Sequence, residues 1–581
     1  MQRISPLLIF IFFLLASFTL VFAQIVYEPL YNDVYKFLER LSQKGIIRFD
    51  DLIKPVSREY IAGKLIEVKC KMENGKWEMG NLTNVEKEQL DFYLMDYSFE
   101  VYFIKNKIKK SSGLDSIETR CKALRSGSEY PILNRQFSIL SSSIGRWRLF
   151  SYSDSLFKLN LNPILGYELG SIDKKSYSHS WNGVYLYGYL SDYLGFSFDF
   201  RDNSETGDNI DRTKSFTPVT GITIASESSN NIQYSEAHAS ISANWNWGDF
   251  TIGKDFLEWG YAESGKLVLS QKAPSFPFIR LDIKPAEWIR FNYIHAWLVS
   301  DVIDSNTIYS SLIPGRQFDR IQYRQKFLAS HTVIVTPYKG LDIALGESII
   351  YSDRLEISYL IPIMFFRLAD HYLSRANNNA GGNSQFFMNI SSKNHIKNTH
   401  LYGTLFIDEI STEAFGNPQK ERNQFGFTLG SSVVDLPVDN LTLTAEYTKI
   451  YPFVYEHYIP TLTYESASYV LGHWMGQNAD LVYGSLNYML LRGLQGTIWA
   501  EYIRKGGQGN PIDQYTQPQP PFLFGLNSRY TYGGFEIKYE ITHDFYARGR
   551  FIFNKISSDQ ESGGKLKQSF NDFYFALFYG L

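Results

Sequence analysis

Apolar and polar residues alternate along most of the chain after about residue 130. Clear examples are residues 184–190, 241–253, 441–447, 496–502 and 535–541. A period of two is that of a β-strand with one apolar and one polar face. Clusters of Gly, Pro, Asn and Asp separate these segments, as turns would. The pattern predicts a mainly β protein built of antiparallel hairpins.

The connections between the predicted strands are of two kinds. Long polar connections lie at 202–231, 301–320, 372–384, 411–422, 505–522 and 556–568. Eight short connections lie near residues 192, 248, 286, 339, 396, 438, 494 and 544. Outer-membrane barrels have short periplasmic turns, long outer loops and an even number of strands. Eight inner turns between two periplasmic termini imply nine hairpins, so we expect a transmembrane antiparallel β-barrel of about 18 strands over residues 131–581.

The end of the chain supports a membrane location. In the predicted last strand one side carries Phe573, Phe575, Leu577, Tyr579 and Leu581. An apolar side of that regularity suits contact with lipid. No apolar run of 18 residues follows the N-terminal leader, which excludes helical membrane spans. A soluble β-sandwich or propeller is the alternative, although no repeat of blade length occurs.

Residues 24–130 have a helical period instead and predict a small periplasmic domain of three amphipathic helices. Gly45 is placed to end the first helix, and Ser57 is placed to cap the second. Thr83 and Glu86 have the spacing of a capping box for the third helix.

Residues 1–23 have the pattern of a signal peptide. Arg3 precedes an apolar run, and Val21 and Ala23 suit a cleavage site before Gln24. An uncleaved anchor helix is the alternative. With cleavage, the mature protein crosses the inner membrane and is expected in the outer membrane of a Gram-negative type of cell.

Composition agrees with a barrel, because 16% of the residues are aromatic and Gly is plentiful, at 42 residues. The formal net charge of −3 implies no polyanionic partner, so nucleic acid is not expected. The two cysteines, Cys70 and Cys121, both lie in the N-terminal part. They could pair in an oxidising compartment or remain thiols, and the sequence leaves both alternatives open.

Residues 250–270 break the strand alternation with a charged, glycine-rich stretch. The carboxylates of Glu258 and Glu263 are too polar for a lipid-facing position. We therefore expect this stretch to fold back at the outer rim into the barrel lumen. There its carboxylates would form ion pairs with Lys254 or Lys266.

The same stretch carries a resemblance to a known family. Together with "WIRFNYIHAWL", "GLDIALGESIIY" and "ISYLIPIMFF", the segment "IGKDFLEWGYAESGKLVLS" resembles the Wzi family of capsule-assembly outer-membrane proteins. The resemblance covers residues 145–581 and the helical region before them. The family-motif positions are Gly253, Lys254, Glu258, Trp259, Gly260, Gly265, Leu269, His295, Gly346, Glu347 and Pro362.

This resemblance implies a lectin-like role in holding capsular or other surface polysaccharide on the outer membrane. The expected partners are outer-membrane lipid, the polysaccharide and, for the helical domain, periplasmic export machinery. Two other functions are open: a porin or substrate-specific channel, and an outer-membrane hydrolase.

The sequence predicts no catalytic residue, no cofactor and no metal site. It holds no G-x-S-x-G and no C-x-x-C motif. Glu258 and Glu263 could form the carboxylate pair of a glycosidase, but an ionic network in the lumen is the favoured explanation for them. The protein is therefore expected not to be an enzyme.

Polysaccharide binding needs aromatic faces beside hydrogen-bonding groups. The outer-loop candidates are Trp259, Tyr261, Tyr469, His473, Trp474, Gln477 and Tyr515. Trp and Tyr also form the interfacial girdles of membrane barrels, so a girdle or packing role is the alternative for each aromatic residue.

Overall fold

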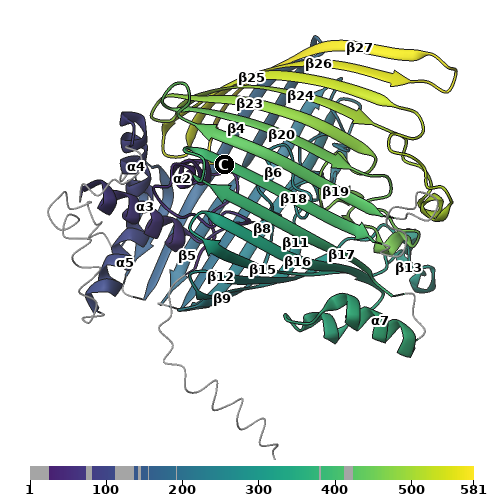
Figure 1. The fold of residues 1–581 in the computed structure, drawn as a ribbon, viewed down its shortest axis with the longest axis horizontal. Coiled ribbons are helices and arrows are strands. Elements are labelled where there is room, and N and C mark those ends of the chain that lie inside the picture. The colour runs from purple at the N-terminus through teal and green to yellow at the C-terminus, as the bar shows by residue number, and fades with distance from the viewer. Residues whose placement is uncertain are drawn as a thin grey trace, which may run out of the picture.

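Figure 1 shows the computed structural model of the chain, in which one large sheet closes into a barrel. The structure describes residues 25–73, 82–110, 137–141, 146–154, 156–191, 193–377, 381–410 and 423–580. The predicted signal peptide and Cys121 lie outside these residues. Cys70 is buried within the helical domain.

Eighteen antiparallel strands of the described residues form the ring, as predicted. Strand β27 pairs with β4, which closes the ring and leaves no open edge between its last and first strands. The strands are β4 (Phe157–Ile172), β5 (Lys175–Leu190), β6 (Leu194–Gly207), β8 (Asn231–Trp245), β9 (Gly248–Asp255), β11 (Phe276–Ala286), β12 (Ile289–Leu298), β15 (Lys326–Tyr338), β16 (Leu341–Ser352), β17 (Asn383–Lys393), β18 (Thr399–Glu409), β19 (Gln424–Val434), β20 (Leu441–Ile450), β23 (Ala479–Leu491), β24 (Leu494–Lys505), β25 (Ser528–Thr542), β26 (Phe545–Asp559) and β27 (Lys565–Tyr579).

Strand β4 extends beyond the end of β27 at one side of the barrel. β27 ends opposite Leu165, so the first residues of β4 would have an unpaired edge. Strand β3 (Arg148–Ser153) pairs with β4 there, and β2 (Phe137–Ser141) pairs with β3. These two short strands continue the sheet where the closing pair has ended.

The eight predicted short connections all occur, and together they define the short-turn rim. The long connections that the structure describes leave the strands at the opposite, long-loop rim, at residues 208–230, 256–275, 299–325, 353–377, 451–478 and 506–527. The connections differ from the prediction in three places. Residues 451–478 were not among the predicted long connections, residues 556–568 are mostly strand, and the first hairpin turns through Asp173 and Lys174 alone.

Side chains alternate between lumen and outside along each strand. On β27, Phe573, Phe575 and Leu577 are exposed, whereas Ala576 and Phe578 are buried, as the sequence predicted. The same alternation around the ring produces an outward apolar band that includes Leu165, Ile241, Ile252, Leu345, Leu429, Val482, Ile498, Phe535 and Phe551. Such a band is the lipid-facing surface of a membrane barrel.

Among its described residues, the N-terminal region has four helices rather than the three predicted. They are α2 (Val34–Gln43), α3 (Arg58–Glu73), α4 (Asn84–Asp96) and α5 (Ser98–Lys110). α5 was missed because it follows α4 after one residue and runs into a basic stretch. No helix among the described residues has the length and apolar character needed to cross a membrane.

The predicted helix signals are confirmed. Gly45 follows α2 with a positive φ of 74°, and the hydroxyl of Ser57 accepts a hydrogen bond from the backbone N–H of Tyr60 at the start of α3. Thr83 and Glu86 form the capping box of α4 in both directions.

The helices gather at the short-turn rim, where ion pairs join them to the barrel (Figure 1). Arg40 of α2 and Lys44, which directly follows the helix, both pair with Asp435, in the turn between β19 and β20. Arg146 bridges Asp96 of α4 and Asp544, in the turn between β25 and β26, at 2.7 and 2.6 Å. Most of these groups are buried, so each needs its partner to remain charged.

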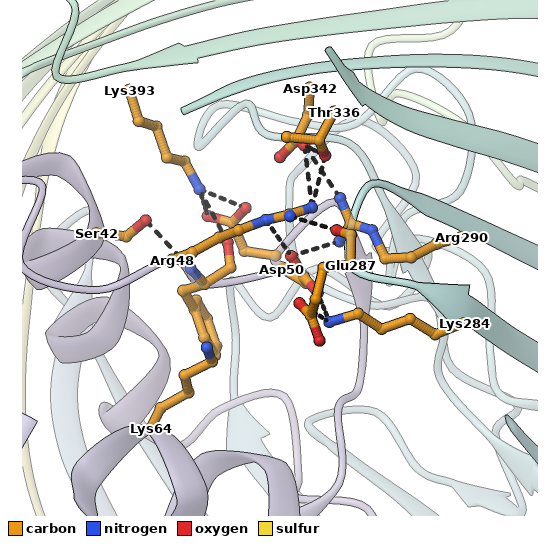
Figure 2. Close-up of polar contacts among 12 residues, drawn as sticks. Ser42, Arg48, Asp50, Lys64, Lys284, Glu287, Arg290, Thr336, Asp342 and Lys393 are labelled. Atoms are coloured by element: carbon orange, nitrogen blue, oxygen red, sulfur yellow. Dashed lines mark hydrogen bonds and ion pairs between the residues drawn. The ribbon is translucent and has the colours of Figure 1, made fainter. Parts of the chain in front are cut away.

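A second group of ion pairs surrounds Asp50, which lies between α2 and α3 (Figure 2). Its carboxylate lies 2.8 Å from Arg290, 3.4 Å from Lys284 and 3.3 Å from Arg48. Burial alone would raise the pKa of Asp50, but these positive charges lower it to about 2. The helical domain is thus held to the barrel through a charge that persists at any ordinary pH.

We expect Asp50→Asn to weaken docking of the helical domain by about 2 kcal/mol at neutral pH. Because the pKa is lowered, this contribution is complete above about pH 4 and is lost as the pH falls towards 2. Hydrogen exchange of the α2 and α3 amides, with the barrel in lipid nanodiscs, measures the change. Glu287→Gln is the matched control: Glu287 pairs with Lys284 in the same group but is exposed, so exchange should stay the same. Equal exchange in Asp50→Asn and wild type would contradict the prediction.

Candidate functional site

The stretch that connects β9 to β11 folds into the barrel lumen, as predicted. We call residues 256–275 the lumen segment. Its strand β10 (Glu258–Trp259) pairs with β1 (Ile53–Lys54) of the helical domain. The backbone N–H of Gly260 also donates to the carbonyl of Leu52. A loop from the long-loop rim and a loop from the short-turn rim therefore meet inside the barrel.

Trp259 is the largest fully buried side chain of the lumen segment, at 1% exposure. Its ring packs edge-to-face on Phe387 of β17, with 5.8 Å between ring centroids. Phe387 in turn covers Gly346 on the neighbouring strand β16, where any side chain would collide with the phenyl ring. The family-motif residues Trp259 and Gly346 are thus two ends of one packed stack.

A second long connection holds the lumen segment in place. We call residues 451–478, which include η6 (Pro460–Leu462), β21 (Glu465–Ser466) and β22 (Tyr469–Val470), the clamp loop. The hydroxyls of Tyr455 and Tyr464 donate to the carbonyls of Leu267 and Val268, at 2.8 and 2.9 Å. The indole N–H of Trp474 donates to the carbonyl of Ser264 at 2.7 Å.

Gly265 lies where the two loops approach most closely. A Cβ at this position would lie 2.6 Å from Nε2 of His473, whose side chain is fully buried. The family-motif glycine therefore allows the clamp loop to pack directly on the lumen segment.

Glu258 and Lys266 of the lumen segment have partners inside the barrel. Glu258 accepts a hydrogen bond from Gln271 and forms an ion pair with Lys266 at 3.4 Å. Lys254 does not join this network: its ammonium donates to the carbonyl of Ala237 and the hydroxyl of Ser275. Of the two lysines named as ion-pair candidates, Lys266 takes that role.

Glu446 of β20 fixes the turn of the lumen segment. Its carboxylate accepts the backbone N–H groups of Glu263 and Ser264, at 2.7 and 2.9 Å, and the hydroxyl of Tyr402. Sequence analysis missed Glu446, although an acidic residue at a lumen-facing strand position is a recognisable signal.

A polar cavity of about 210 Å³ remains between α2, the lumen segment and strands β18–β20, β23 and β24. Tyr261, Glu263, His400 and Tyr402 are among its lining residues. Within the described ranges, no three His, Cys, Asp or Glu side chains are arranged to hold a metal ion.

Two family-motif residues lie on the outer face of the barrel wall and are nevertheless buried. His295 of β12 and Glu347 of β16 belong to the outward-facing set of side chains, yet both are buried. They are covered by a connection that contains η4 (Ile357–Leu360) and α7 (Phe366–Asn377). The carboxylate of Glu347 accepts the backbone N–H groups of Phe366 and Arg367 at 2.8 and 2.6 Å, which caps the first turn of α7.

The polysaccharide-binding candidates have different environments. Trp259, His473, Trp474 and Gln477 are buried. Tyr261 and Tyr469 are partly buried, and the hydroxyl of Tyr469 donates to the carbonyl of Thr213 in a neighbouring loop. Tyr515 alone among the seven is exposed, at 37%. Sugar binding by the buried residues stays a prediction and would require the loops to open.

Tyr515 has an exposed aromatic neighbour that sequence analysis missed. Tyr458 of the clamp loop lies edge-to-face with Tyr515, 5.8 Å between ring centroids, and stacks on His457. Exposed Thr516 and Gln517 follow Tyr515. We call His457, Tyr458 and Tyr515 the rim platform. Tyr458 and Tyr515 are 57 positions apart in sequence, so no local motif reveals the platform.

Comparisons with known proteins agree with the geometry. Residues 187–567 match the family model described as capsule assembly protein Wzi. The fold is similar to that of Wzi, described as an outer membrane protein involved in group 1 capsule assembly in Escherichia coli and as a carbohydrate-binding β-barrel, at 12% identity and a TM-score of 0.51. That similarity covers 96% of this chain and 100% of the other.

Two further solved structures are similar at lower scores. OpdK of Pseudomonas aeruginosa with vanillate has 10% identity and a TM-score of 0.41, covering 72% of this chain and 98% of the other. OccAB4 of Acinetobacter baumannii has 9% identity and a TM-score of 0.41, covering 74% and 98%. No curated protein matches the sequence.

We expect Gly346→Ala to destabilise the barrel by about 1–3 kcal/mol, because the added methyl displaces the Phe387 ring from Trp259. Denaturant unfolding in lipid, followed by tryptophan fluorescence, measures the loss. Gly549→Ala on β26 is the matched control, since a Cβ there meets nothing within 4 Å. In a Phe387→Ala background the same Gly346→Ala change should cost less, and the cost that remains comes from the 2.7 Å approach of the added Cβ to the backbone carbonyl oxygen of His331. Equal costs in the two backgrounds would show that the stack does not carry the effect.

Proposed function

The chain belongs to the family of the capsule assembly protein Wzi, and we propose that it is a non-catalytic, lectin-like outer-membrane protein that associates capsular or another surface polysaccharide with the cell. One observation carries this proposal. Segments from both rims enter the lumen and meet there, which makes the long-loop rim the polar surface available to a large ligand. A polymer would bind there, on top of the barrel.

The orientation follows from the loops. Short turns face the periplasm in outer-membrane barrels, so the helical domain would lie in the periplasm and the long-loop rim outside the cell. We also propose that residues 1–23 are a cleaved signal peptide. The helical domain would then be the part that periplasmic export machinery contacts.

The rim platform has the chemistry that sugar recognition needs. Exposed tyrosine rings offer flat apolar faces, and Thr516 and Gln517 offer hydrogen-bonding groups beside them. Each contact is weak on its own. A polysaccharide repeats its units, and many copies of the barrel lie in one membrane, so modest contacts add up to firm attachment.

We expect loss of the rim platform to release polysaccharide into the medium while synthesis continues. Each ring removed by Tyr458→Ala or Tyr515→Ala should cost about 1 kcal/mol, a factor of roughly five in affinity per contact. The measurement is the ratio of cell-bound to shed polymer in a deletion strain that carries each variant. Tyr338→Ala is the matched control, because Tyr338 is also an exposed tyrosine but lies at the short-turn end of β15. Cell-bound polymer at the wild-type level in the variant that combines Tyr458→Ala with Tyr515→Ala would contradict the role of the platform. The same level in the deletion strain without any copy of the protein would contradict anchoring itself.

A channel function makes the opposite prediction for ion flow. We expect the full chain to give no steady conductance in planar bilayers, because the lumen segment, the clamp loop and the helical domain meet inside the lumen and narrow it. An open porin inserted in the same bilayers is the control for insertion and detection. Long-lived conductance steps from the purified protein would favour the channel over the lectin-like function.

A further inference from the structure

The connection between β16 and β17 lies against the outside of the barrel wall. We call residues 353–377 the wall segment; it holds η4 and α7, and Figure 1 shows α7 outside the strands near the long-loop rim. Phe366 of α7 is fully buried against Tyr293, Ala329 and Ile349. These three side chains belong to the outward-facing sets of β12, β15 and β16. The wall segment therefore covers part of the surface that faces lipid elsewhere.

The side of the wall segment turned away from the barrel is also apolar. Ile363, Leu368 and Tyr372 are 84, 64 and 72% exposed. Phe365, Leu368 and Tyr372 have the spacing of one helix face, distinct from the face of Phe366 that packs on the wall. A helix with two apolar faces is expected where a second apolar medium contacts it. Exposed apolar surface of this extent marks an interaction site.

The position of this surface identifies the medium. The exposed Leu345 and Val333 lie on the same outward faces of β16 and β15 as the residues under α7, so the surface continues the lipid-facing band. Arg354, Arg367 and Arg375 are exposed beside the apolar side chains, and Arg354 and Arg367 also lie 3.8 Å from the carboxylates of Glu356 and Asp370. Guanidinium groups pair well with phosphate, so apolar contact and guanidinium groups occur together, as at an anionic headgroup layer.

We propose that the wall segment is an interfacial anchor: its exposed apolar side enters the lipid layer at the long-loop rim, and its arginines bind phosphate groups of the lipid headgroups. The anchor rests on the membrane location proposed above and is independent of sugar binding. It would fix the height of the barrel in the membrane on this side of the wall.

The anchor also accounts for Glu347. A carboxylate at an outward-facing barrel position would be costly in lipid. Here the helix covers the Glu347 carboxylate, and the backbone N–H groups of Phe366 and Arg367 donate hydrogen bonds to it. The residue that is least compatible with lipid is the residue that fixes the start of the anchor helix.

A fluorescent label measures the depth of the segment directly. Leu368→Cys is labelled with bimane in a Cys121→Ser background, with Cys70 buried in the helical domain, and the protein is placed in nanodiscs. Quenching is compared for lipids brominated near the headgroup and for aqueous iodide. Leu312→Cys is the matched control, because Leu312 is 79% exposed on the hairpin of β13 (Tyr309–Ile313) and β14 (Arg316–Arg320) in another long connection.

We expect the label at 368 to be quenched by brominated lipid and shielded from iodide, and the label at 312 to behave in the opposite way. Equal iodide quenching at both positions would overturn the proposal, and a label at Tyr372→Cys repeats the test at a second site. In anionic phosphatidylglycerol the label at 368 should lie deeper in the lipid layer than in phosphatidylcholine. The double change Arg367→Gln with Arg375→Gln should abolish that difference in depth. A lipid-independent depth in the wild type would overturn the phosphate contact. Failure of the protein to enter nanodiscs would instead contradict the membrane location.

Discussion

A ring of eighteen strands encloses more space than the side chains of its own walls can fill. A barrel of this size is either an aqueous channel or a container for other parts of the chain. In this protein the helical domain and two long connections supply the filling. Strands β1 and β10 are only two residues each, yet their pairing is where the filling from the two rims meets. Closure of the lumen, and therefore the role of the outer rim, depends on that meeting point.

The interior is divided between two kinds of interaction. Near the meeting point the contacts are those of a soluble core: Ile53, Trp259, Phe387, Tyr455 and Leu471 share one apolar cluster. At the short-turn rim the contacts are buried ion pairs. Burying a charge is costly unless a partner stands in a fixed place, so ion pairs add geometric precision more than net stability. The apolar cluster stabilises the segments inside the lumen, and the ion pairs determine how the helical domain is oriented against the short turns.

Much of the fold was predictable because local signals decide it. Most of the short turns hold a Gly, Asn or Asp with a positive φ, such as Gly340 or Asp544, and the alternation fixes which side of a strand faces lipid. The candidate site was less predictable, since a polar loop with aromatic residues has the same composition whether it enters the lumen or reaches solvent. Trp474 and Tyr458 lie in one loop, one buried and one exposed. One clue was available: alternation along β16 places Glu347 between Leu345 and Ile349 on the lipid side, which requires that something cover it.

The clamp loop connects the buried and exposed parts of the molecule. Tyr455 hydrogen-bonds to the lumen segment, and Tyr458, three residues later, stands at the rim beside Tyr515. A ring held in one position loses less conformational freedom on binding a sugar than a ring on an unsupported loop, so more of the contact energy remains as affinity. The segments inside the lumen therefore support the long-loop rim from below and hold its residues in place. A barrel whose lumen stayed open could hold the same residues at its rim, but not in a fixed arrangement that a repeating polymer can meet many times.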